Sequence, residues 1–260
     1  MEYICSVKNE KMKFIGIIPA RFRSVRFPGK PLALINGKPM IRWVVDQAEK
    51  ALENVWVATD HEDIFNAVKS FGGKVLMTSP DHQSGTDRCA EAASRLSGKV
   101  DFEVVINIQG DEPFIRPEQI RELMSCFTPG VGIATLIRKI TSEDDLENPN
   151  KPKVVVDKSG EALYFSRSVI PFLRGAGRNE WVTSHVFWAH IGMYGYHRNV
   201  LQQLTKLTPS TLEMAESLEQ LRWLENGFRI KTAETGFHGI GIDTPEDLEF
   251  AVSHFKDFCS

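Results

Sequence analysis

The first apolar run of the chain leads directly into a loop that concentrates positive charge. Residues 14–18 are apolar, the run ends at Pro19, and four cationic side chains then fall within ten residues: Arg21, Arg23, Arg26 and Lys30. Ligands of open α/β sheets bind beyond the carboxyl ends of the strands. A buried strand that delivers this loop, together with Ser24 and Gly29, predicts a polyphosphate site at that end of a sheet.

This loop lacks the two common phosphate-binding signatures. The chain has no G-x-G-x-x-G segment, and the nearest approach to a P-loop fails because Pro39 follows Lys38 where Ser or Thr is needed. A nicotinamide-dependent dehydrogenase and a P-loop kinase are therefore not favoured. The alternative to a phosphate site is a solvated surface loop of basic residues.

The bulk properties predict a globular protein with a local basic site. The chain has 260 residues, 42% hydrophobic and 25% charged, with a net charge of −3, which argues against a nucleic-acid binder. It has no apolar run near the roughly 20 residues that span a bilayer, and residues 1–13 lack the apolar core of a signal peptide. Four scattered cysteines fit reduced thiols, so we expect a cytoplasmic protein without membrane insertion.

Apolar runs and helical periods alternate through the first half of the chain. We expect strands at 14–18, 55–58, 75–77 and 104–108 and helices at 40–52, after an N-cap at Asp60, at 86–96 and at 117–127. This order predicts a Rossmann-like, mostly parallel sheet with helices on both faces.

The second half has a different character. We expect strands at 131–137, 189–196 and 228–233, a hairpin of 154–156 with 162–165, loops at 141–151 and 174–183, a helix from Ser210 to Gly227, and a last helix opened by Thr244–Asp247. The whole chain, 1–260, is predicted to be one α/β domain with a β-rich insertion at about 138–205.

Two carboxylates follow apolar segments that read as strands. Asp111 comes after 104–108, and Asp243 comes after 239–242 and directly precedes the predicted N-cap Thr244. Mg²⁺ in proteins takes one or two carboxylates and completes its shell with water and phosphate oxygens. The pair therefore predicts a Mg²⁺ site, the alternative being that Asp111 starts a turn and Asp243 helps to cap a helix.

A third loop, 81–88, leads into a predicted helix. Ser84, Gly85 and Thr86 can present backbone N–H groups and hydroxyls to a polar ring or a phosphate, although an ordinary helix start explains them equally well. The residues that remain have structural explanations when each is taken alone, as core or solvated side chains: Arg167, His190, Tyr194, Glu219 and Gln220.

Taken together, several segments resemble the 3-deoxy-manno-octulosonate (Kdo) cytidylyltransferases, also called CMP-Kdo synthetases. The similarity runs from about residue 14 to residue 251, and the loops H-Q-S-G-T and Q-G-D-E-P are its most specific parts. The segments that carry it are 17–21, 28–32, 57–60, 81–88, 107–113, 164–167, 190–196, 218–222 and 241–248. Residues 1–13 and 174–183 lie outside the similarity or match it poorly.

This resemblance implies transfer of CMP from CTP to the anomeric hydroxyl of Kdo, with release of pyrophosphate, for lipopolysaccharide biosynthesis. It also implies a nucleotide-diphospho-sugar transferase fold, dependence on Mg²⁺, a cytoplasmic location and a homodimer built through the β-rich insertion. A cytidylyltransferase for another 2-keto acid sugar, such as a sialic acid, a GT-A glycosyltransferase and a catalytically inactive binding protein are the alternatives. An Asp-x-Asp signature, which GT-A enzymes usually need, is broken at Asp111-Glu112-Pro113.

The resemblance also implies roles for particular residues. Arg21, Lys30, Asp111 and Asp243 are the expected catalytic set, with both aspartates on the metal. The nucleotide is expected to contact Pro19, Ala20, Arg21, Ser24, Lys30, Gln83, Ser84, Gly85 and Asp111. The sugar is expected to lie among Arg88, Gln109, Arg167, His190, Tyr194, Glu219 and Gln220.

Overall fold

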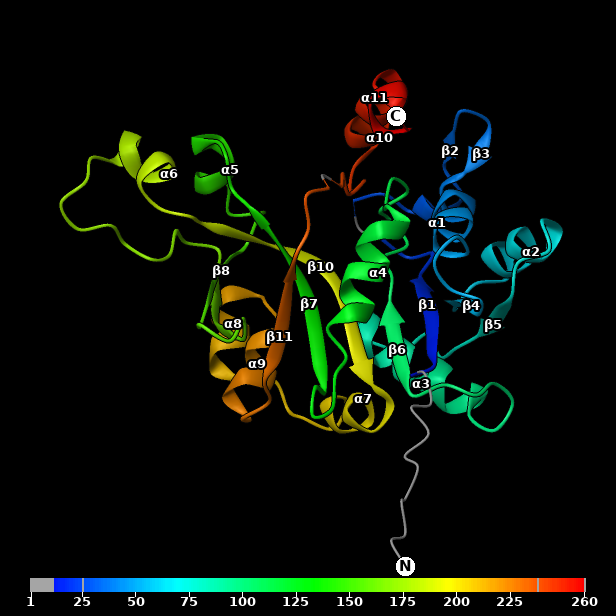
Figure 1. The fold of residues 1–260 in the computed structure, drawn as a ribbon. Helices are drawn as coiled ribbons and strands as arrows, with labels where there is room; N and C mark the ends of the chain where they lie inside the picture. Colours follow the sequence, from blue (N-terminus) through cyan, green and yellow to red (C-terminus); the bar gives the residue numbers. More distant parts are fainter. Residues whose placement is uncertain (1–11, 25, 238, 260) are drawn as a thin grey trace, which may run out of the picture.

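A mixed sheet forms the centre of the molecule. The structure is a computed structural model that describes residues 12–24, 26–237 and 239–259, and within these residues the sheet has nine strands. Seven run in the order β11-β7-β10-β6-β1-β4-β5, while β8 pairs with β10 and with β9 (Figure 1). Their bounds are β1 Phe14–Ala20, β4 Val55–Thr59, β5 Val75–Met77, β6 Val104–Asn107, β7 Ile133–Lys139, β8 Lys153–Val156, β9 Ala162–Ser166, β10 Trp188–His197 and β11 Ile230–Glu234.

The parallel part of the sheet comes from the first half of the chain, as the alternating pattern predicts. β1 pairs in parallel with both β4 and β6, and β4 pairs in parallel with β5. β10 is antiparallel to β6 and to β7, and β11 returns to the parallel direction beside β7. The carboxyl end of β6 and the amino-terminal half of β10 therefore lie at the same edge of the sheet.

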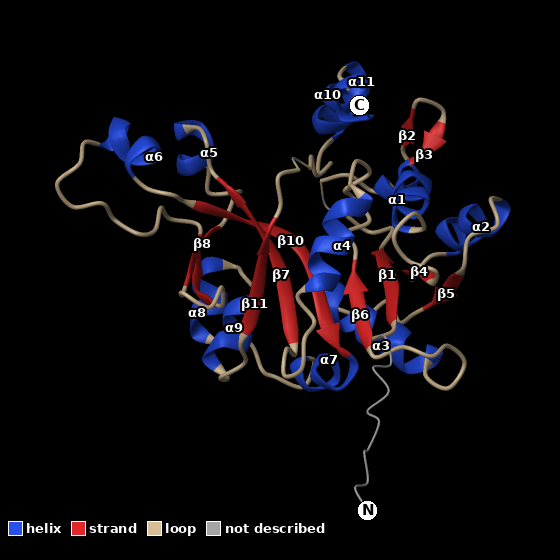
Figure 2. Ribbon diagram, in the orientation of Figure 1, coloured by secondary structure: helices blue, strands red, loops and turns tan. Residues whose placement is uncertain are grey.

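Helices cover both faces of the sheet, which gives three layers (Figure 2). Apolar side chains of α1 Met40–Ala48, α2 Glu62–Ser70 and α4 Pro117–Ser125 pack in one cluster with sheet residues such as Ile18 and Ile106. Those of α3 Gly85–Leu96, α7 Arg198–Leu204 and α9 Gln220–Glu225 form the second cluster with residues such as Ile17 and Val105. Adjacent residues of one strand thus face opposite layers, and the β1 and β6 segment is buried on both sides.

The remaining elements are short. A small hairpin of β2 Leu34–Ile35 and β3 Lys38–Pro39 follows a turn of 3₁₀ helix, η1 Lys30–Leu32. The chain ends in α10 Pro245–Ser253 and α11 Phe255–Cys259, which lie near α1 beyond the carboxyl edge of β1 and β6 (Figure 1). α10 begins with the predicted capping box, in which Thr244 accepts from the N–H of Asp247.

The expected cap at Asp60 is wrong. The N-cap of α2 is His61, whose ring nitrogen accepts from the N–H of Asp63 at 3.2 Å. The carboxylate of Asp60 instead accepts a hydrogen bond from the guanidinium of Arg88 at 2.9 Å. Asp60 thus forms a buried ion pair and does not cap the helix, although its position in the sequence suggests a cap.

The expected continuous helix from Ser210 to Gly227 is two helices, α8 Thr211–Glu216 and α9 Gln220–Glu225. The break falls at Ser217, which adopts a left-handed conformation with φ 51° and ψ 48°. Arg167 donates to the carbonyls of Glu216 (2.6 Å) and Ser217 (3.2 Å), so these groups are satisfied outside the helix. A distant side chain therefore stabilises a break that the helical period does not reveal.

Two segments expected to be loops contain helices. Ser142 caps α5 Glu143–Glu147 within the polar stretch 141–151. In the stretch 174–183, the 3₁₀ turn η2 Arg178–Glu180 leads into α6 Trp181–Ser184, where Trp181 is 2% exposed and packs on Phe187. These helices and the loop before them form an arm that projects from the sheet in Figure 1, and the buried tryptophan fixes the turn that carries it.

The segment 138–205, expected as a β-rich insertion, is continuous with the central sheet because β10 runs between β6 and β7. No helix of the described residues is long and apolar enough to cross a membrane. Cys89 and Cys126 are free and buried, whereas residues 1–11, which include Cys5, lie outside the described part of the chain.

Candidate active site

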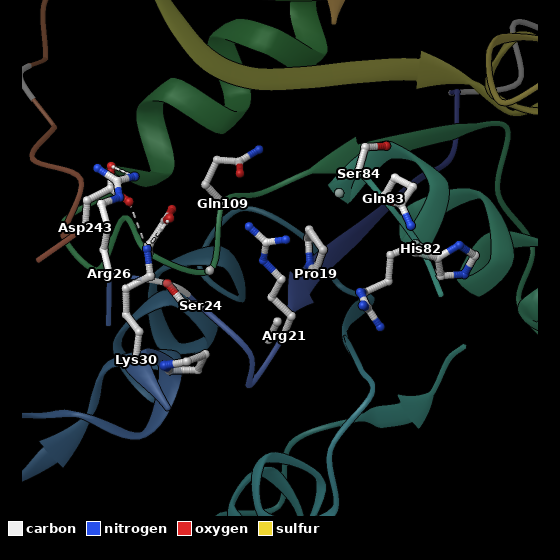
Figure 3. A pocket seen from close by; sticks show the side chains of 16 residues that line it. Pro19, Arg21, Ser24, Arg26, Lys30, His82, Gln83, Ser84, Gln109 and Asp243 are labelled. Carbon is white, nitrogen blue, oxygen red and sulfur yellow. Dashed lines mark hydrogen bonds and ion pairs between the residues drawn. The ribbon is translucent and has the colours of Figure 1, made fainter. Parts of the chain in front are cut away.

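A cavity of about 310 Å³ opens at the carboxyl edge of β1 and β6. Its walls come from the cationic loop after β1, from the loop before α3, from the segment after β6 and from Asp243 (Figure 3). Every residue predicted to contact the nucleotide lines it, namely Pro19, Ala20, Arg21, Ser24, Lys30, Gln83, Ser84, Gly85 and Asp111. Arg88 and Gln109, from the predicted sugar set, line it as well.

The two predicted metal carboxylates converge on one ammonium group. Lys30 Nζ lies 2.7 Å from Asp111 Oδ2 and 3.1 Å from Asp243 Oδ1. Arg26 adds a second cation, with Nη2 3.0 Å from the other oxygen of Asp243. Two acidic residues that are 132 positions apart in the sequence thus share one positively charged neighbour at one end of the cavity.

Local packing brings Asp243 to Asp111. The N–H of Ile242 donates to the carbonyl of Asp111 at 2.9 Å, which ties the two segments together at the backbone. The carboxylate of Asp247 accepts from the N–H groups of Asp243 and Thr244, both at 2.9 Å. Because these bonds occupy the backbone, the carboxylate of Asp243 remains available to the cavity.

The pKa values of two acidic groups in this region, Asp243 and Glu112, are shifted in opposite directions. Burial alone would raise the pKa of Asp243, but Lys30 and Arg26 outweigh it and hold the pKa below its usual value. The pKa of Glu112 is raised to about 7, first by burial and then by the charges of Asp111 and Asp243. Lys30 and Arg26 therefore favour the charged form of Asp243, whereas burial and the neighbouring carboxylates favour the neutral form of Glu112.

Gly110 allows two loops to meet beneath the cavity. A side chain there would place its first carbon 2.9 Å from the carbonyl oxygen of Pro19, closer than real contacts allow. The end of β1 and the segment after β6 are consequently in contact, and Pro19, Gly110 and Asp111 all line the cavity. Close backbone approach explains why glycine stands in front of Asp111.

The loop before α3 is held by its own hydrogen bonds. Ser84 caps α3 in a capping box with Asp87, and the amide of Gln83 donates to the carbonyl of Asp81 at 2.9 Å. His82 pairs with Glu91, which also accepts from the N–H of Ser79 at 2.8 Å. The loop presents its outer edge to the cavity opposite the Lys30–Asp243 group, with Arg21 and Gln109 between them (Figure 3).

Arg88 lies beneath this loop rather than free in the cavity. Its guanidinium donates to Asp60 (2.9 Å), to the hydroxyl of Thr78 (2.6 Å) and to the carbonyl of Ser79 (3.2 Å). The residue is 3% exposed. These three hydrogen bonds give Arg88 a structural role in holding the loop before α3.

Most of the predicted sugar residues form a polar group next to the cavity, at the β6–β10 edge. Tyr194 pairs in register with Asn107, the last residue of β6, and Gln109 donates to the carbonyl of Gly192 at 3.0 Å. Glu219 accepts from the hydroxyl of Thr86 at 2.8 Å. Burial raises the pKa of Glu219 despite this bond.

Several polar atoms in this group are unpaired. Among the described residues, the Tyr194 hydroxyl, the Gln220 side-chain nitrogen and the Asn107 side-chain oxygen are buried without a hydrogen-bond partner. His190 lies 3.0 Å from the hydroxyl of Thr135, and burial lowers its pKa to about 3. Buried polar groups are normally satisfied, so the three unpaired atoms are unusual.

Arg167 is the exception in the predicted sugar set. Its guanidinium donates to the carbonyls of Glu216, Ser217 and Pro149, at the break between α8 and α9. It does not line the cavity. Its contacts place it behind Glu219 and Gln220, at the turn that positions both residues.

Three residues of the site stand outside the predicted catalytic, nucleotide and sugar sets. Arg26 pairs with Asp243, His82 anchors the loop before α3, and Gly110 makes the close contact with Pro19. Arg26 and His82 stand inside the segments that were already recognised as charged or polar loops, so their position in those segments was the available signal. Among the described residues, no group of three or more His, Cys, Asp or Glu side chains is arranged to hold a metal ion, and a metal here would depend on Asp111 and Asp243.

Comparison with known proteins defines the class. A family model described as Cytidylyltransferase matches residues 15–231. A structure of a glucose-1-phosphate thymidylyltransferase from Bacillus anthracis, 16% identical, superposes with a TM-score of 0.63 over 94% of this chain and 96% of its own, which shows the fold alone. The sheet, the cavity and the family match define a nucleotidyltransferase of the cytidylyltransferase class.

More similar proteins narrow the class to one family. The chain is 57% identical over 247 residues to the 3-deoxy-manno-octulosonate cytidylyltransferase of Parabacteroides distasonis, covering 93% of this chain and 98% of the relative. It is 54% identical over 250 residues to that of Bacteroides thetaiotaomicron, covering 95% and 99%. A structure of CMP:2-keto-3-deoxy-manno-octonic acid synthetase complexed with CTP gives a TM-score of 0.86 at 42% identity, covering 94% and 99%.

The chain belongs to the 3-deoxy-manno-octulosonate cytidylyltransferase family. Membership confirms the resemblance carried by the sequence segments. It favours Kdo over the sialic-acid and glycosyltransferase alternatives.

Proposed function

We propose that this cavity transfers CMP from CTP to the anomeric hydroxyl of Kdo and releases pyrophosphate. The observation that carries the proposal is the convergence of Asp111 and Asp243 on the ammonium of Lys30, within a cavity that the predicted nucleotide loops enclose. The product is the activated sugar that lipopolysaccharide assembly consumes.

The triphosphate is held by the loop after β1. Arg21, Ser24 and Lys30 line the cavity, and Lys30 contacts both Asp111 and Asp243. The cationic groups of Arg21 and Lys30 neutralise the negative charge that accumulates on the departing pyrophosphate. Such charge stabilisation, together with positioning, is the main contribution a protein makes to phosphoryl transfer. Little covalent chemistry is left for the protein, so positioning dominates.

The residues present fit a Mg²⁺ ion. One oxygen of each carboxylate lies within hydrogen-bond distance of Lys30 Nζ, so both carboxylates can contact a single cation. Two carboxylates together with phosphate oxygens are a usual Mg²⁺ ligand set. Asp111 and Asp243 would hold the ion. When bound, it supplies charge neutralisation and polarisation of phosphate oxygens.

The base is read by the loop before α3. Gln83 and Ser84 lie at the end of the cavity away from Asp243 (Figure 3), and Gly85 lines the cavity as well. Their side-chain and backbone polar groups can pair with the exocyclic amine and the carbonyl of cytosine, which a uracil ring would leave mismatched.

The sugar lies against the polar group at the β6–β10 edge. The buried, unpaired atoms of Tyr194 and Gln220 are suited to sugar hydroxyls, while Gln109, Glu219 and neutral His190 surround them. Arg167 steadies the α8–α9 turn beneath the sugar through the carbonyls of Glu216 and Ser217. From this side the 2-hydroxyl attacks the α-phosphorus in line with the departing pyrophosphate, and Asp111 and Lys30 lie at the point of transfer.

We further propose that the chain is a single nucleotidyltransferase domain that works as a cytoplasmic homodimer. The β-rich segment 138–205 presents large apolar side chains to solvent, among them Leu163 (60% exposed) and Phe172 (77% exposed). A partner subunit that covers them is consistent with the dimer implied by the family. Sedimentation of the purified protein tests the dimer.

One assay tests the function. Pyrophosphate release is measured with each of the four nucleoside triphosphates, with and without Kdo and with and without Mg²⁺. Release is expected only with CTP, Kdo and Mg²⁺ together, and CMP-Kdo should be recovered by mass spectrometry. Release with a sialic acid in place of Kdo, or with CTP alone, would contradict the proposal.

A further inference from the structure

Lys30 occupies the position of a cation between the two acidic groups of the cavity. Its ammonium lies within 3.1 Å of an oxygen of each carboxylate, and its side chain is only 12% exposed. In contrast, the side chains of Asp111 and Asp243 are 34% and 48% exposed. The lysine thus covers the point between the carboxylates, while the carboxylates themselves keep a free face toward the cavity.

Arg26 supplies a second positive charge beside Asp243. It pairs with the second oxygen of Asp243 at 3.0 Å from an exposed position. Two carboxylates are therefore matched by two side-chain cations in the nucleotide-free protein. A divalent ion that enters this point alone adds two positive charges beside Lys30 and must displace its ammonium, which opposes binding electrostatically.

The triphosphate can remove this obstacle. Lys30 follows Gly29, which holds a left-handed conformation (φ 70°) and donates to the carbonyl of Phe22 at 2.9 Å, so the backbone of the loop is anchored. The flexible four-carbon stem of lysine lets the ammonium move while the backbone stays. Arg21 and Ser24 line the same cavity, and phosphates bound there offer the ammonium a new set of anionic partners.

We propose that Lys30 is an internal counter-ion that excludes a divalent cation from Asp111 and Asp243 until a bound triphosphate draws the ammonium away. The cation and the nucleotide therefore enter together, and neither carboxylate is left without a positive partner at any stage. This inference rests on the metal role proposed above for the two aspartates. Since linkage is reciprocal, the cation strengthens nucleotide binding by the same factor as the nucleotide strengthens cation binding.

Binding of Mn²⁺ to the nucleotide-free protein tests the inference without turnover. Loss of the electron paramagnetic resonance signal of free Mn²⁺ is measured for the wild type, for Lys30→Met and for Lys38→Met. Lys38 also pairs with an aspartate, Asp46, at 2.7 Å, but neither residue lines the cavity. We expect Lys30→Met to bind Mn²⁺ about tenfold or more tightly than the wild type, and Lys38→Met to match the wild type.

A second measurement determines how strongly nucleotide binding and Mn²⁺ binding are coupled. A non-hydrolysable CTP analogue should raise the Mn²⁺ affinity of the wild type by a larger factor than that of Lys30→Met, because only the wild type has an ammonium to remove. Lys30→Gln repeats both arms if the Met variant does not fold. Equal Mn²⁺ affinities of the wild type and the Lys30 variants without nucleotide would overturn the inference.

The double variant Lys30→Met/Asp111→Asn separates this inference from the proposed function. If it loses the tight Mn²⁺ site gained by Lys30→Met, the gained site involves Asp111, as the inference requires. If it retains that site, Asp111 is not the ligand that Lys30 protects and the inference fails. The proposed function itself fails only if the wild type does not release pyrophosphate from CTP and Kdo in the presence of Mg²⁺.

Discussion

The guanidinium of Arg88 donates to the carboxylate of Asp60 at 2.9 Å, and the two side chains are only 4% and 12% exposed. Asp60 also accepts from the N–H of Phe22 at 3.3 Å, while Arg88 binds Thr78 and Ser79. One buried pair therefore connects the loop after β1, the proposed phosphate loop, with the loop before α3, the proposed base loop.

Replacing Arg88 by Met should destabilise the protein strongly. The change leaves the charge of Asp60 buried without its partner, and breaking one side of a buried pair costs about 3–5 kcal/mol. The free energy of unfolding measured in urea checks this. Arg95→Met is the control, because Arg95 pairs with Glu91 from a side chain that is 54% exposed and such pairs contribute about 0–1 kcal/mol. Similar losses for both variants would contradict the structural role.

Asp111→Asn should reduce turnover by orders of magnitude and leave CTP binding measurable. The amide keeps the size of the side chain but removes one of the two charges on which the proposed metal depends. Pyrophosphate release at saturating Mg²⁺ and calorimetric titration with CTP are the two measurements. Asp46→Asn, at a paired aspartate away from the cavity, is the control. Turnover near that of the wild type would remove Asp111 from the metal role.

Arg167→Ala should raise the KM for Kdo far more than the KM for CTP. Arg167 holds the carbonyls of Glu216 and Ser217 directly before Glu219 and Gln220, and hydrogen bonds from a charged group are worth about 1.5–3 kcal/mol, so about tenfold or more is expected. Initial rates with each substrate varied in turn check this. Arg229→Ala, at a side chain that is 82% exposed, should change neither constant. Equal effects on both substrates would place Arg167 outside the sugar site.

Protonation of His190 should oppose folding in mild acid. Burial lowers its pKa from 6.5 to about 3, so between these values the unfolded chain binds a proton that the folded protein does not. Stability from this group is complete above pH 6.5 and falls as the pH decreases toward 3, by up to about 1.4 kcal/mol per pH unit. Urea unfolding at pH 7 and pH 5 should show a smaller loss for His190→Asn than for the wild type. An identical loss would mean that His190 titrates normally.

Gly110→Ala should damage the cavity more than the fold. The added carbon would lie 2.9 Å from the carbonyl of Pro19 and separate the two loops that carry Arg21 and Asp111. We expect kcat/KM for CTP to fall by about tenfold or more, consistent with the sensitivity of catalysis to misplacements near 1 Å. Gly236→Ala is the control, since an added carbon there has no neighbour within 4 Å among the described residues. Unchanged kinetics for Gly110→Ala would show that the contact is not required.

The parallel half of the fold could be predicted because its signals are local. The apolar run 104–108 and the helical periods around it specify a buried strand and its covering helices, and the sheet order follows from right-handed crossovers and burial. The cavity residues after β1 and β6 follow from the same rule, since strand ends meet at one edge. The loop after β1 and the segment after β6 were therefore expected at one edge of the sheet, whereas a role for 81–88 in the site came from the family resemblance.

Contacts between distant segments could not be predicted in this way. The convergence of Asp111 and Asp243 on Lys30 depends on the chain returning past β11 and across the sheet edge, which no local pattern encodes. Ser217 breaks a helix that its own sequence supports, because Arg167 satisfies the exposed carbonyls. Asp60 resembles a helix cap in sequence, but Arg88 binds it instead. In each case a partner far along the chain overrides a local preference.

The reversed direction of β10 has a consequence for how such enzymes diversify. The nucleotide loops emerge from strands β1 and β6, whereas His190 and Tyr194 stand on a strand that enters the same edge from the opposite direction. Changes along that one strand and at the α8–α9 turn can alter which acid is activated without rebuilding the part that handles the nucleotide. On the proposed assignment, the donor and acceptor sites lie on different strands, which would let protein engineers vary the choice of sugar without altering the nucleotide loops.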